Sequence, residues 1–357
     1  MEIGSEFALF ESRQQTVEQK SVYEMIKNIG QDSKFLFSGR TAIDYILQDI
    51  KVDVRTVYAP SYCCDSMLQP FIDKGLNIEF YEVVFKNGSV IYKVDFDKKI
   101  DVFLGMSYFG FYISNMDEII SIFHRKNVLV IEDITHRLFS TKNYCEKSDY
   151  LIGSIRKWLP LPSGGVAIKR NSFFKNVKLN KPPVAIINKK IEAMKKKAKY
   201  LVSRSSKIAK NEFLALYSEF NKSLSQTYKN LTIDDYSMNI LLYSSVEEIK
   251  KKRLENTIYL YEQLKSSKDI QFMFDTFDPS KDCPLFVPLM VNDILRDKIR
   301  SNLIQNSVYC PIHWPPSKAL NINSRIFNIY NQELSLICDQ RYGISDMRYQ
   351  INKLGEF

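Results

Sequence analysis

Short apolar runs alternate with amphipathic stretches between residues 35 and 170. Seven runs have the length of strands, and they cover residues 35–38, 56–62, 78–85, 102–109, 128–134, 150–155 and 166–168. Between the first two, residues 40–50 place four apolar side chains on one helical face, Ile43, Ile46, Leu47 and Ile50. Strands that alternate with helices predict an α/β fold whose large domain carries a mostly parallel seven-stranded sheet.

The pattern becomes helical and basic after residue 185. Residues 186–210 predict one long helix with an apolar stripe made of Ile191, Met194, Ala198, Leu201 and Val202. The lysines expected to face outward from it are Lys195, Lys196, Lys197 and Lys199. We interpret them as a solvated helix face in preference to a phosphate-binding or membrane-surface element.

The last third of the chain predicts a second, smaller unit. Residues 246–264 have the spacing of another long helix, strand-like runs follow at 285–291, 307–312 and 334–337, and a helix over 346–354 ends the chain. We therefore predict a large domain over residues 1–245, with an N-terminal segment and a connecting helix, and a small C-terminal α/β domain over 246–357.

Composition narrows the class of protein. A chain of 357 residues, 45% of them hydrophobic, can bury a large core without disulfides or metals. The net charge of +9 favours phosphorylated or acidic ligands, but the 41 acidic residues are dispersed, so charge alone does not indicate nucleic-acid binding. The sequence has no signal-peptide pattern, no apolar run approaching the roughly 18 residues of a membrane span, and six cysteines outside any disulfide framework. These features predict a cytoplasmic protein with reduced thiols.

Polar residues follow the predicted strands, where open α/β sheets bind their ligands. They are Gly39, Arg40, Thr41, Tyr62, Cys64, Tyr108, Asp133, His136, Ser154, Arg156 and Lys157. Each has an ordinary alternative, such as a turn cap for Asp133, a structural imidazole for His136 or a surface basic pair for Arg156 and Lys157. Their joint occurrence at successive strand ends favours one ligand site. Mostly apolar neighbours over residues 151–155 and 158–162 also count against a surface role for Lys157, and favour an amine that attacks an aldehyde.

Six patches, by their order and spacing, resemble the DegT/DnrJ/EryC1/StrS family of sugar aminotransferases, which has the fold of aspartate aminotransferase (fold type I). They are Ser38-Gly39-Arg40-Thr41-Ala42, Ala59-Pro60-Ser61-Tyr62, Val130-Ile131-Glu132-Asp133-Ile134-Thr135-His136, Gly153-Ser154-Ile155-Arg156-Lys157 with Gly164-Gly165-Val166, Pro311-Ile312-His313-Trp314-Pro315, and Leu334-Ser335-Leu336. The resemblance runs from about residue 35 to the end. It implies pyridoxal 5′-phosphate (PLP) as cofactor and a homodimer with shared active sites.

The resemblance also implies a role for each matching residue. Lys157 would hold PLP as a Schiff base and move the substrate proton. Asp133 would pair with the pyridine nitrogen and keep it protonated, and His136 would bond the ring hydroxyl or orient Asp133. The residues expected to bind the phosphate are Gly39, Arg40 and Thr41 at a helix start, with Ser154 and Arg156.

Departures from the family pattern concern the residues around the cofactor. The family has a serine five residues before the lysine and a histidine between them, whereas here Ser154 lies three before and Arg156 is adjacent. The position that usually carries a stacking ring is Cys64, so Tyr62 or Tyr108 would stack instead. No Gly-Asn-x-Arg stretch, which in the family reaches the partner subunit, is evident. These differences indicate that the chain would be a divergent member of the family.

The sequence thus predicts an aminotransferase that moves an amino group from an amino acid, by resemblance glutamate, to a keto sugar linked to a nucleotide, for cell-surface polysaccharide or glycan biosynthesis. His313, Trp314 and Arg341 are candidate substrate residues, although a surface ion pair is the favoured interpretation of Arg341. One alternative is a PLP enzyme with a non-sugar substrate, either an amino-acid aminotransferase or a decarboxylase. Another is a non-catalytic protein that binds nucleic acid or lipid through the basic helix. A zinc site at Cys310 and His313 lacks a second ligand pair.

Overall fold

The structure is a computed structural model that describes residues 2–10, 20–50, 52–203, 207–265, 267, 270–320 and 327–355. It divides into two compact units. The first unit comprises residues 6–52 and 150–246, and the second comprises residues 2–5, 53–149 and 247–357. This division follows compactness and leaves the predicted domain boundary at residues 245 and 246 as a prediction.

Three antiparallel strands form the sheet portion of the first unit. They are β2 (Asp32–Leu36), β9 (Gly165–Lys169) and β8 (Tyr150–Ser154), in the order β2-β9-β8. Helix α2 (Gly39–Asp49) packs on β8 and β9, and α1 (Val22–Lys27) begins at a capping box made by Ser21 and Glu24. The short 3₁₀ turn η1 (Ile155–Lys157) follows β8, and α7 (Asp235–Tyr243) lies later in the chain.

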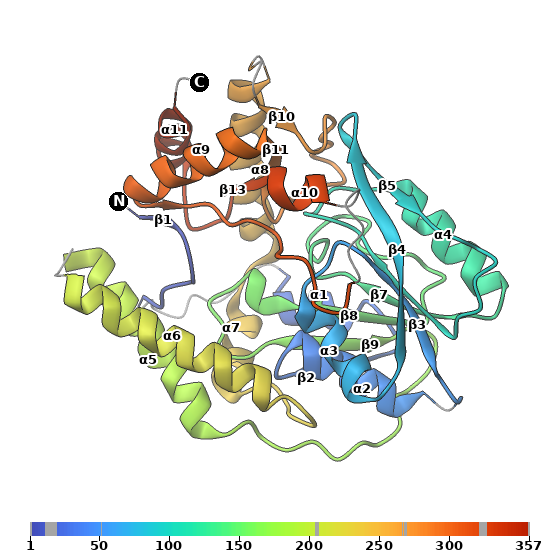
Figure 1. Cartoon of the computed structure of the whole chain (residues 1–357). Coiled ribbons are helices and arrows are strands. Elements are labelled where there is room, and N and C mark those ends of the chain that lie inside the picture. The colour runs from blue at the N-terminus through green and yellow to red at the C-terminus, as the bar shows by residue number, and fades with distance from the viewer. Residues whose placement is uncertain are drawn as a thin grey trace. The chain divides into compact units, whose positions relative to one another are not determined.

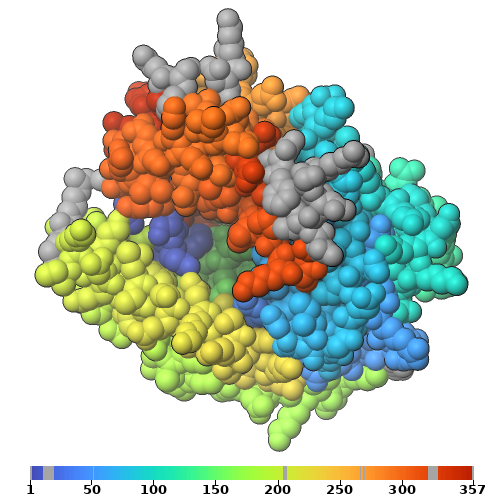
Figure 2. Space-filling view, viewed as in Figure 1, coloured from blue at the N-terminus to red at the C-terminus, as the bar shows by residue number. Residues whose placement is uncertain are grey.

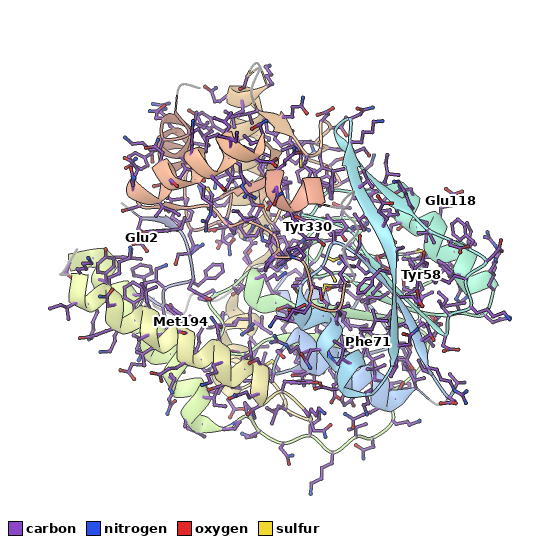
Figure 3. All side chains as sticks on the ribbon, in the orientation of Figure 1. Glu2, Tyr58, Phe71, Glu118, Met194 and Tyr330 are labelled. Atoms are coloured by element: carbon purple, nitrogen blue, oxygen red, sulfur yellow. The ribbon has the colours of Figure 1, made fainter. Side chains whose placement is uncertain are left out.

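Two long helices, α5 (Val184–Ser203) and α6 (Lys207–Gln226), lie side by side in the first unit (Figures 1 and 2). The predicted stripe is partly right: Met194, labelled in Figure 3, is buried between the helices with Phe213 and Tyr217. The prediction that Val202 belongs to the buried stripe is wrong, because its side chain is exposed. The sequence also predicted one helix over residues 186–210, where the structure has nearly all of α5, which ends at Ser203, and the start of α6 at Lys207.

Lys197 corrects the prediction of an outward basic face on α5. Its side chain is buried and its Nζ donates to the backbone carbonyl of Glu6. Lys190 on the same helix is buried as well. Lys195 and Lys199 are exposed as predicted, whereas Lys189 and Lys196 are partly exposed and each has a glutamate partner on α6. The basic helix is therefore not a uniformly solvated face.

The second unit contains the parallel strands that the sequence predicted. They are β7 (Leu129–Asp133), β6 (Val102–Met106), β3 (Thr56–Pro60) and β4 (Asn77–Lys86), in the order β7-β6-β3-β4. Helices α3 (Asp65–Asp73) and α4 (Ser114–Arg125) accompany them. Stacked and edge-on rings of Tyr58, Tyr81, Phe103 and Phe123 fill the space beside β3 and β6.

An eighth strand corrects the predicted number of seven. Strand β5 (Ser89–Lys93) pairs antiparallel with β4 through a hairpin whose turn is Asn87-Gly88. Both turn residues have positive φ, +52° and +63°, as a two-residue hairpin turn requires. The described strands of the predicted sheet therefore number three in the first unit and five in the second.

The C-terminal part of the second unit has its own small sheet. Strands β10 (Gln271–Phe272), β11 (Val287–Met290) and β13 (Glu333–Leu336) pair antiparallel, and β1 (Ile3–Gly4) pairs parallel with β12 (Val308–Tyr309). The helices are α8 (Val246–Leu264), α9 (Asp293–Gln305), α10 (Phe327–Gln332) and α11 (Ile344–Asn352). Ile3, Leu260, Leu289, Ile299 and Leu336 are members of one buried cluster.

A backbone contact at Gly165 joins the start of β9 to the start of α2. A Cβ atom at residue 165 would lie 2.1 Å from the carbonyl oxygen of Ser38 and 2.9 Å from the amide of Gly39. Only a residue without a side chain permits this approach. The preceding Gly164 donates its N–H to the carbonyl of Phe37 at 2.9 Å, so both glycines fix the position of the helix start.

We predict that Gly165→Ala destabilises the fold by about 1–3 kcal/mol, because the added methyl must push two backbone segments apart. Urea denaturation measures the change. Gly39→Ala is the matched control, since its Cβ would meet the Ser154 Cβ at an ordinary 3.5 Å. Equal stability of the two variants would contradict the proposed close contact.

Candidate active site

Ser38 caps helix α2 at the position predicted for phosphate binding. Its Oγ accepts the amide of Thr41 at 3.3 Å and lies 3.0 Å from Thr41 Oγ1, which donates to the carbonyl of Tyr228 at 2.7 Å. Thr41 is fully buried and its amide and hydroxyl already have these partners. Of the predicted phosphate ligands, Gly39 lies directly against Ser154, so the helix start and that hydroxyl-bearing residue are neighbours.

The turn that carries Lys157 is fixed by its own backbone and by buried flanking residues. The amides of Ile155 and Arg156 both donate to the carbonyl of Gly164, at 2.9 and 3.4 Å. Ile155 and Trp158 are completely buried, whereas Lys157 between them is partly exposed. Lys157 therefore sits on a turn that is anchored on both sides, and its role as the lysine that holds a cofactor stays a prediction.

Arg156 is a largely desolvated cation in the same turn. Its Nε is buried with no hydrogen-bond partner among the described residues, and its guanidinium lies 5.8 Å from the centre of the Phe220 ring. Burial lowers the pKa of Arg156 to about 10; the Glu6 carboxylate opposes this change and the Arg40 charge adds to it. The guanidinium stays charged at neutral pH, as a phosphate ligand must.

Asp133 ends strand β7 in the second unit and is buried. Its Oδ1 accepts the amide of Thr135 at 2.8 Å, which fixes the carboxylate in place. Met106 is its register partner on β6. The strand therefore delivers a fixed acceptor group to the carboxyl end of the parallel strands, where the sequence predicted it.

His136 lies three residues after Asp133 and is fully buried, and one of its ring nitrogens accepts a hydrogen bond. Its Nδ1 accepts the amide of Phe109 at 3.0 Å. A neutral imidazole with this bond carries its proton on Nε2, so that nitrogen is a donor. Trp314 stacks on the ring with centroids 5.6 Å apart and planes 28° apart. The structure thus brings His136 and Trp314 into contact. The sequence did not predict this contact, because the two residues are far apart along the chain.

Tyr62 and Tyr108 are buried inside an aromatic cluster. Tyr108 Oη donates to the carbonyl of Tyr62 at 2.7 Å, and Tyr62 Oη donates to the carbonyl of His313. Both rings have no exposed surface, whereas Trp314, 5.0 Å from the Tyr62 ring, is partly exposed. A stacking role for either tyrosine stays a prediction, and the partly exposed rings of this cluster include Trp314 and Phe85. Cys64 is partly exposed and its Sγ lies 2.9 Å from Ser66 Oγ.

Two predicted substrate residues have protein partners. His313 Nδ1 lies 3.0 Å from Ser335 Oγ and 3.4 Å from Glu333 Oε1, and both of those residues are buried. Arg341 makes a bidentate pair with Asp339, at 2.9 and 2.7 Å, and bonds the carbonyl of Ser5. Sequence reasoning missed Glu333, although it directly precedes the Leu-Ser-Leu patch. The Arg341 ion pair is the interpretation that the sequence favoured for that residue.

In the part of the chain that the structure describes, the cysteine, histidine and acidic side chains do not form a metal site. No group of three such residues gathers there, and Cys310 donates to Gln350 while His313 faces Glu333 and Ser335. All six cysteines are free thiols, and burial raises the pKa of Cys63 well above its usual range. Such a thiol is a poor nucleophile at neutral pH.

A buried ion pair lies next to Asp133 in the sequence. Arg137 Nη1 is 3.8 Å from Glu132 Oε1 and donates to Ser107 Oγ at 3.1 Å. Glu132 also accepts from Ser148 Oγ at 2.6 Å and from the amide of Cys145 at 2.8 Å. Burial raises the pKa of Glu132 to about 7, although Arg137 and these hydrogen bonds favour the ionised form.

Comparisons with known proteins bear on the fold. No family model and no curated protein matches the chain. Among solved structures, a putative sugar aminotransferase, Spr1654 from Streptococcus pneumoniae in its PLP form, matches with a TM-score of 0.64 and 13% identity, over 93% of this chain and 90% of that chain. Helicobacter pylori PseC, an aminotransferase of pseudoaminic acid biosynthesis, matches with a TM-score of 0.68 and 10% identity, over 99% and 98%.

DesI, solved with its TDP-sugar product, matches with a TM-score of 0.64 and 13% identity, over 93% of this chain and 83% of that chain. At these identities the similarity shows the fold. It confirms the predicted α/β architecture, that of the fold type I aminotransferases. No helix within the described residues is both long and apolar enough to cross a bilayer.

The residues present fit PLP by their chemistry. The first unit supplies a helix N-terminus, a serine hydroxyl, a guanidinium and an amine, and the second supplies a fixed carboxylate, an imidazole donor and aromatic rings. Lys157 belongs to the first unit and Asp133 to the second, so their approach to one another stays a prediction.

Glu132 should lower the free energy of unfolding as pH rises from about 4.5 to about 7. In that range the folded chain holds its proton more tightly than the unfolded chain, whose pKa is near 4.5. Stability from this group is therefore greatest below pH 4.5 and falls by roughly 3 kcal/mol up to pH 7. Glu132→Gln should flatten this part of the pH profile, measured by urea denaturation at several pH values.

Glu118→Gln serves as the control for that measurement, because Glu118 lies exposed on α4 (Figure 3). Its pH profile should run parallel to that of the wild type. Parallel profiles for Glu132→Gln as well would show that Glu132 titrates at its ordinary pKa in the folded chain.

Proposed function

We propose that this chain is a PLP-dependent aminotransferase. It transfers the amino group of an amino acid, expected to be glutamate, to a keto sugar, expected to be nucleotide-linked, for the biosynthesis of a cell-surface polysaccharide or other glycan. One observation carries the proposal: a partly exposed Lys157 stands on a turn anchored to Gly164, beside the capped start of α2, in a fold shared with sugar aminotransferases.

The phosphate of the cofactor would lie at the start of α2. Backbone amides at a helix N-terminus attract anions, and Gly39 lies against Ser154 at this point. Arg156 adds a charged group whose buried Nε has no partner among the described residues. Thr41 contributes less directly, because its amide is bonded to Ser38 and its hydroxyl to Tyr228.

Asp133 and His136 would hold the ring of the cofactor. Asp133, fixed by the amide of Thr135, would pair with the pyridine nitrogen and keep it protonated. His136, whose Nε2 carries the proton because Nδ1 accepts from Phe109, would donate to the ring hydroxyl. Bound PLP supplies an electron sink for the negative charge that develops when the substrate loses its proton. Lys157 Nζ would hold the cofactor and then take the proton from the substrate Cα.

Several observations support a nucleotide-linked sugar as acceptor. The structure of DesI contains a TDP-sugar product and PseC acts in pseudoaminic acid biosynthesis, as their descriptions state. The net charge of +9 suits a diphosphate ligand. Trp314, partly exposed and stacked on His136, offers an apolar ring to a sugar, and His313 lies next to it. Arg341 would bind a substrate carboxylate only if its pair with Asp339 opened.

Three further features belong to the proposal. We infer a homodimer with shared active sites, a cytoplasmic location in keeping with six free thiols, and a domain boundary near residues 245 and 246. The separate hydrophobic cluster around Leu260, Leu289 and Leu336 supports the small C-terminal domain.

Lys157→Ala should abolish covalent attachment of PLP. The measurement is mass spectrometry of protein incubated with PLP, reduced with borohydride and then denatured, together with release of keto acid from glutamate. Lys189→Ala, on the exposed side of α5, should retain both the attachment and the keto-acid release. Attachment of PLP to another lysine in the wild type would sink the assignment.

Asp133→Asn should keep PLP but lose about 10- to 1000-fold in turnover, because the ring nitrogen loses a contact carboxylate that shifts its pKa by roughly 1–3 units. Bound PLP is quantified by its absorbance, and turnover by single-turnover release of keto acid from glutamate. Asp53→Asn, at an exposed surface pair with Arg55, is the control. Unchanged turnover in Asp133→Asn would remove Asp133 from the cofactor.

A further inference from the structure

Two charged side chains bracket the segment that carries Asp133 and His136. Glu132 directly precedes Asp133 in β7, and Arg137 directly follows His136. Both side chains are only 1% exposed, and Arg137 Nη1 lies 3.8 Å from Glu132 Oε1. Charged residues are rarely buried to this extent unless they are paired. The two ends of a four-residue segment are therefore joined by a buried pair.

Glu132 lies on the face of the sheet opposite to Asp133. Successive side chains of a strand point to opposite faces, and these two carboxylates are consecutive in β7. Glu132 accepts from the Ser148 hydroxyl at 2.6 Å and from the Cys145 amide at 2.8 Å, both in the loop that follows the strand. Glu132 therefore does not touch a ring that Asp133 holds, and any effect on the cofactor must pass through the backbone.

Arg137 connects the segment to two neighbouring loops. Its Nη1 donates to Ser107 Oγ at 3.1 Å, just after β6, and its Nη2 donates to the carbonyl of Lys142. The guanidinium also lies 5.4 Å from the centre of the Tyr112 ring. The amide of Arg137 donates to the carbonyl of Ile134 at 2.9 Å, which closes the segment into a turn. Side chain and backbone of this one residue thus fix the end of the segment.

The two groups proposed to hold the cofactor ring depend on the shape of this turn. The amide of Thr135 donates to Asp133 Oδ1 at 2.8 Å, and the amide of Phe109 donates to His136 Nδ1 at 3.0 Å. Hydrogen bonds of this kind weaken steeply when donor and acceptor lose their alignment. A displacement of residues 133–136 would therefore turn the carboxylate and the imidazole at the same time.

We propose that Glu132 and Arg137 are positioning residues, which hold the Asp133 carboxylate and the His136 imidazole where the cofactor ring requires them. This inference rests on the proposed function and extends it by two residues that do not touch the cofactor. A misplacement of about 1 Å at a reacting group can cost about 100-fold in rate. Contacts behind the site that lock its side chains are therefore part of what makes such a site active.

The arrangement does not require a charged Glu132. Burial raises the pKa of Glu132 to about 7, and the Asp117 carboxylate adds to this rise, whereas Arg137 and the two hydrogen bonds from the loop oppose it. The carboxyl group is then partly protonated at neutral pH, and both of its forms accept hydrogen bonds. Glu132→Gln keeps an acceptor oxygen and is the conservative variant, whereas Glu132→Leu removes the acceptors and keeps a similar size.

Amide hydrogen exchange of PLP-free protein, followed by mass spectrometry, measures the order of the segment directly. Glu132→Leu and Arg137→Met should each speed exchange in peptides containing residues 133–136 by about tenfold or more, because a buried hydrogen-bonding group loses its partner. Glu132→Gln should exchange at close to the wild-type rate. The double variant Glu132→Leu/Arg137→Met should exchange faster than the wild type but more slowly than the product of the two single effects, since the residues act as a pair.

The same variants should also change the behaviour of the cofactor site. Glu132→Leu and Arg137→Met should bind PLP more weakly and lose about 10- to 100-fold in turnover. Glu132→Gln should remain close to the wild type in both. Absorbance of bound PLP and release of keto acid from glutamate are the measurements. Rescue by the glutamine, which keeps the acceptor, separates a positioning role from a requirement for charge.

Lys169→Met is the matched control, because Lys169 forms a buried pair with Asp49 in the first unit, at 2.6 Å and with side chains 16% and 0% exposed. It should lower the midpoint of thermal unfolding but leave exchange of residues 133–136 unchanged. Equal acceleration in Lys169→Met and Arg137→Met would show a global effect and overturn the proposal, as would wild-type exchange in Arg137→Met. Where Arg137→Met does not fold, Arg137→Lys, which loses the two-armed donor, takes its place with the same expected direction.

Measuring exchange without PLP separates this inference from the proposed function. A wild-type protein that never binds PLP would count against the aminotransferase, whereas the exchange rates would still show whether the pair orders residues 133–136. Normal PLP binding and turnover in Glu132→Leu and Arg137→Met would reject the positioning role alone and leave the aminotransferase in place.

Discussion

The contact between Gly165 and the Ser38 carbonyl governs the geometry of the first unit. It brings the start of β9 within van der Waals distance of the start of α2, and Gly164 then receives the amides of Ile155 and Arg156 on its carbonyl while donating to Phe37. Three segments that are distant in sequence are thereby held by backbone atoms alone. Since backbone hydrogen bonds and a missing Cβ leave little freedom, the turn that carries Lys157 and the start of α2 have a fixed relation.

The chemistry of the proposed enzyme is divided between the two units by the sign of charge. The first unit contributes the helix start, Arg156 and Lys157, and the second contributes Asp133 together with the His136 imidazole and aromatic rings. Several buried ionisable groups have specific partners, such as Glu6 for Lys190 in the first unit and, in the second, the Thr135 amide for Asp133 and Arg137 for Glu132. Burial without such partners would shift these groups toward their neutral forms and remove the charges that the proposed cofactor binding requires.

The sequence predicted the strands and most strand-end residues, because buried strands are continuous apolar runs and the polar residues follow them directly. It missed β5, although Asn87-Gly88 is a strong hairpin signal, because the run after it is short and alternates with polar residues. It could not predict the burial of Lys190 and Lys197, since a lysine on a basic helix is usually solvated and their partner, Glu6, is 184 positions from Lys190. Nor could it place Trp314 on His136, because stacking depends on tertiary packing between segments that local periodicity does not describe.

The pair formed by Glu6 and Lys190 has a consequence for how related sequences diverge. The two residues meet across 184 positions, and a buried ammonium without its carboxylate is more costly than a neutral pair. Exchange of one residue is therefore tolerated best when the other changes in the same lineage. Positions 6 and 190 should therefore covary among relatives that keep the α5–α6 pair.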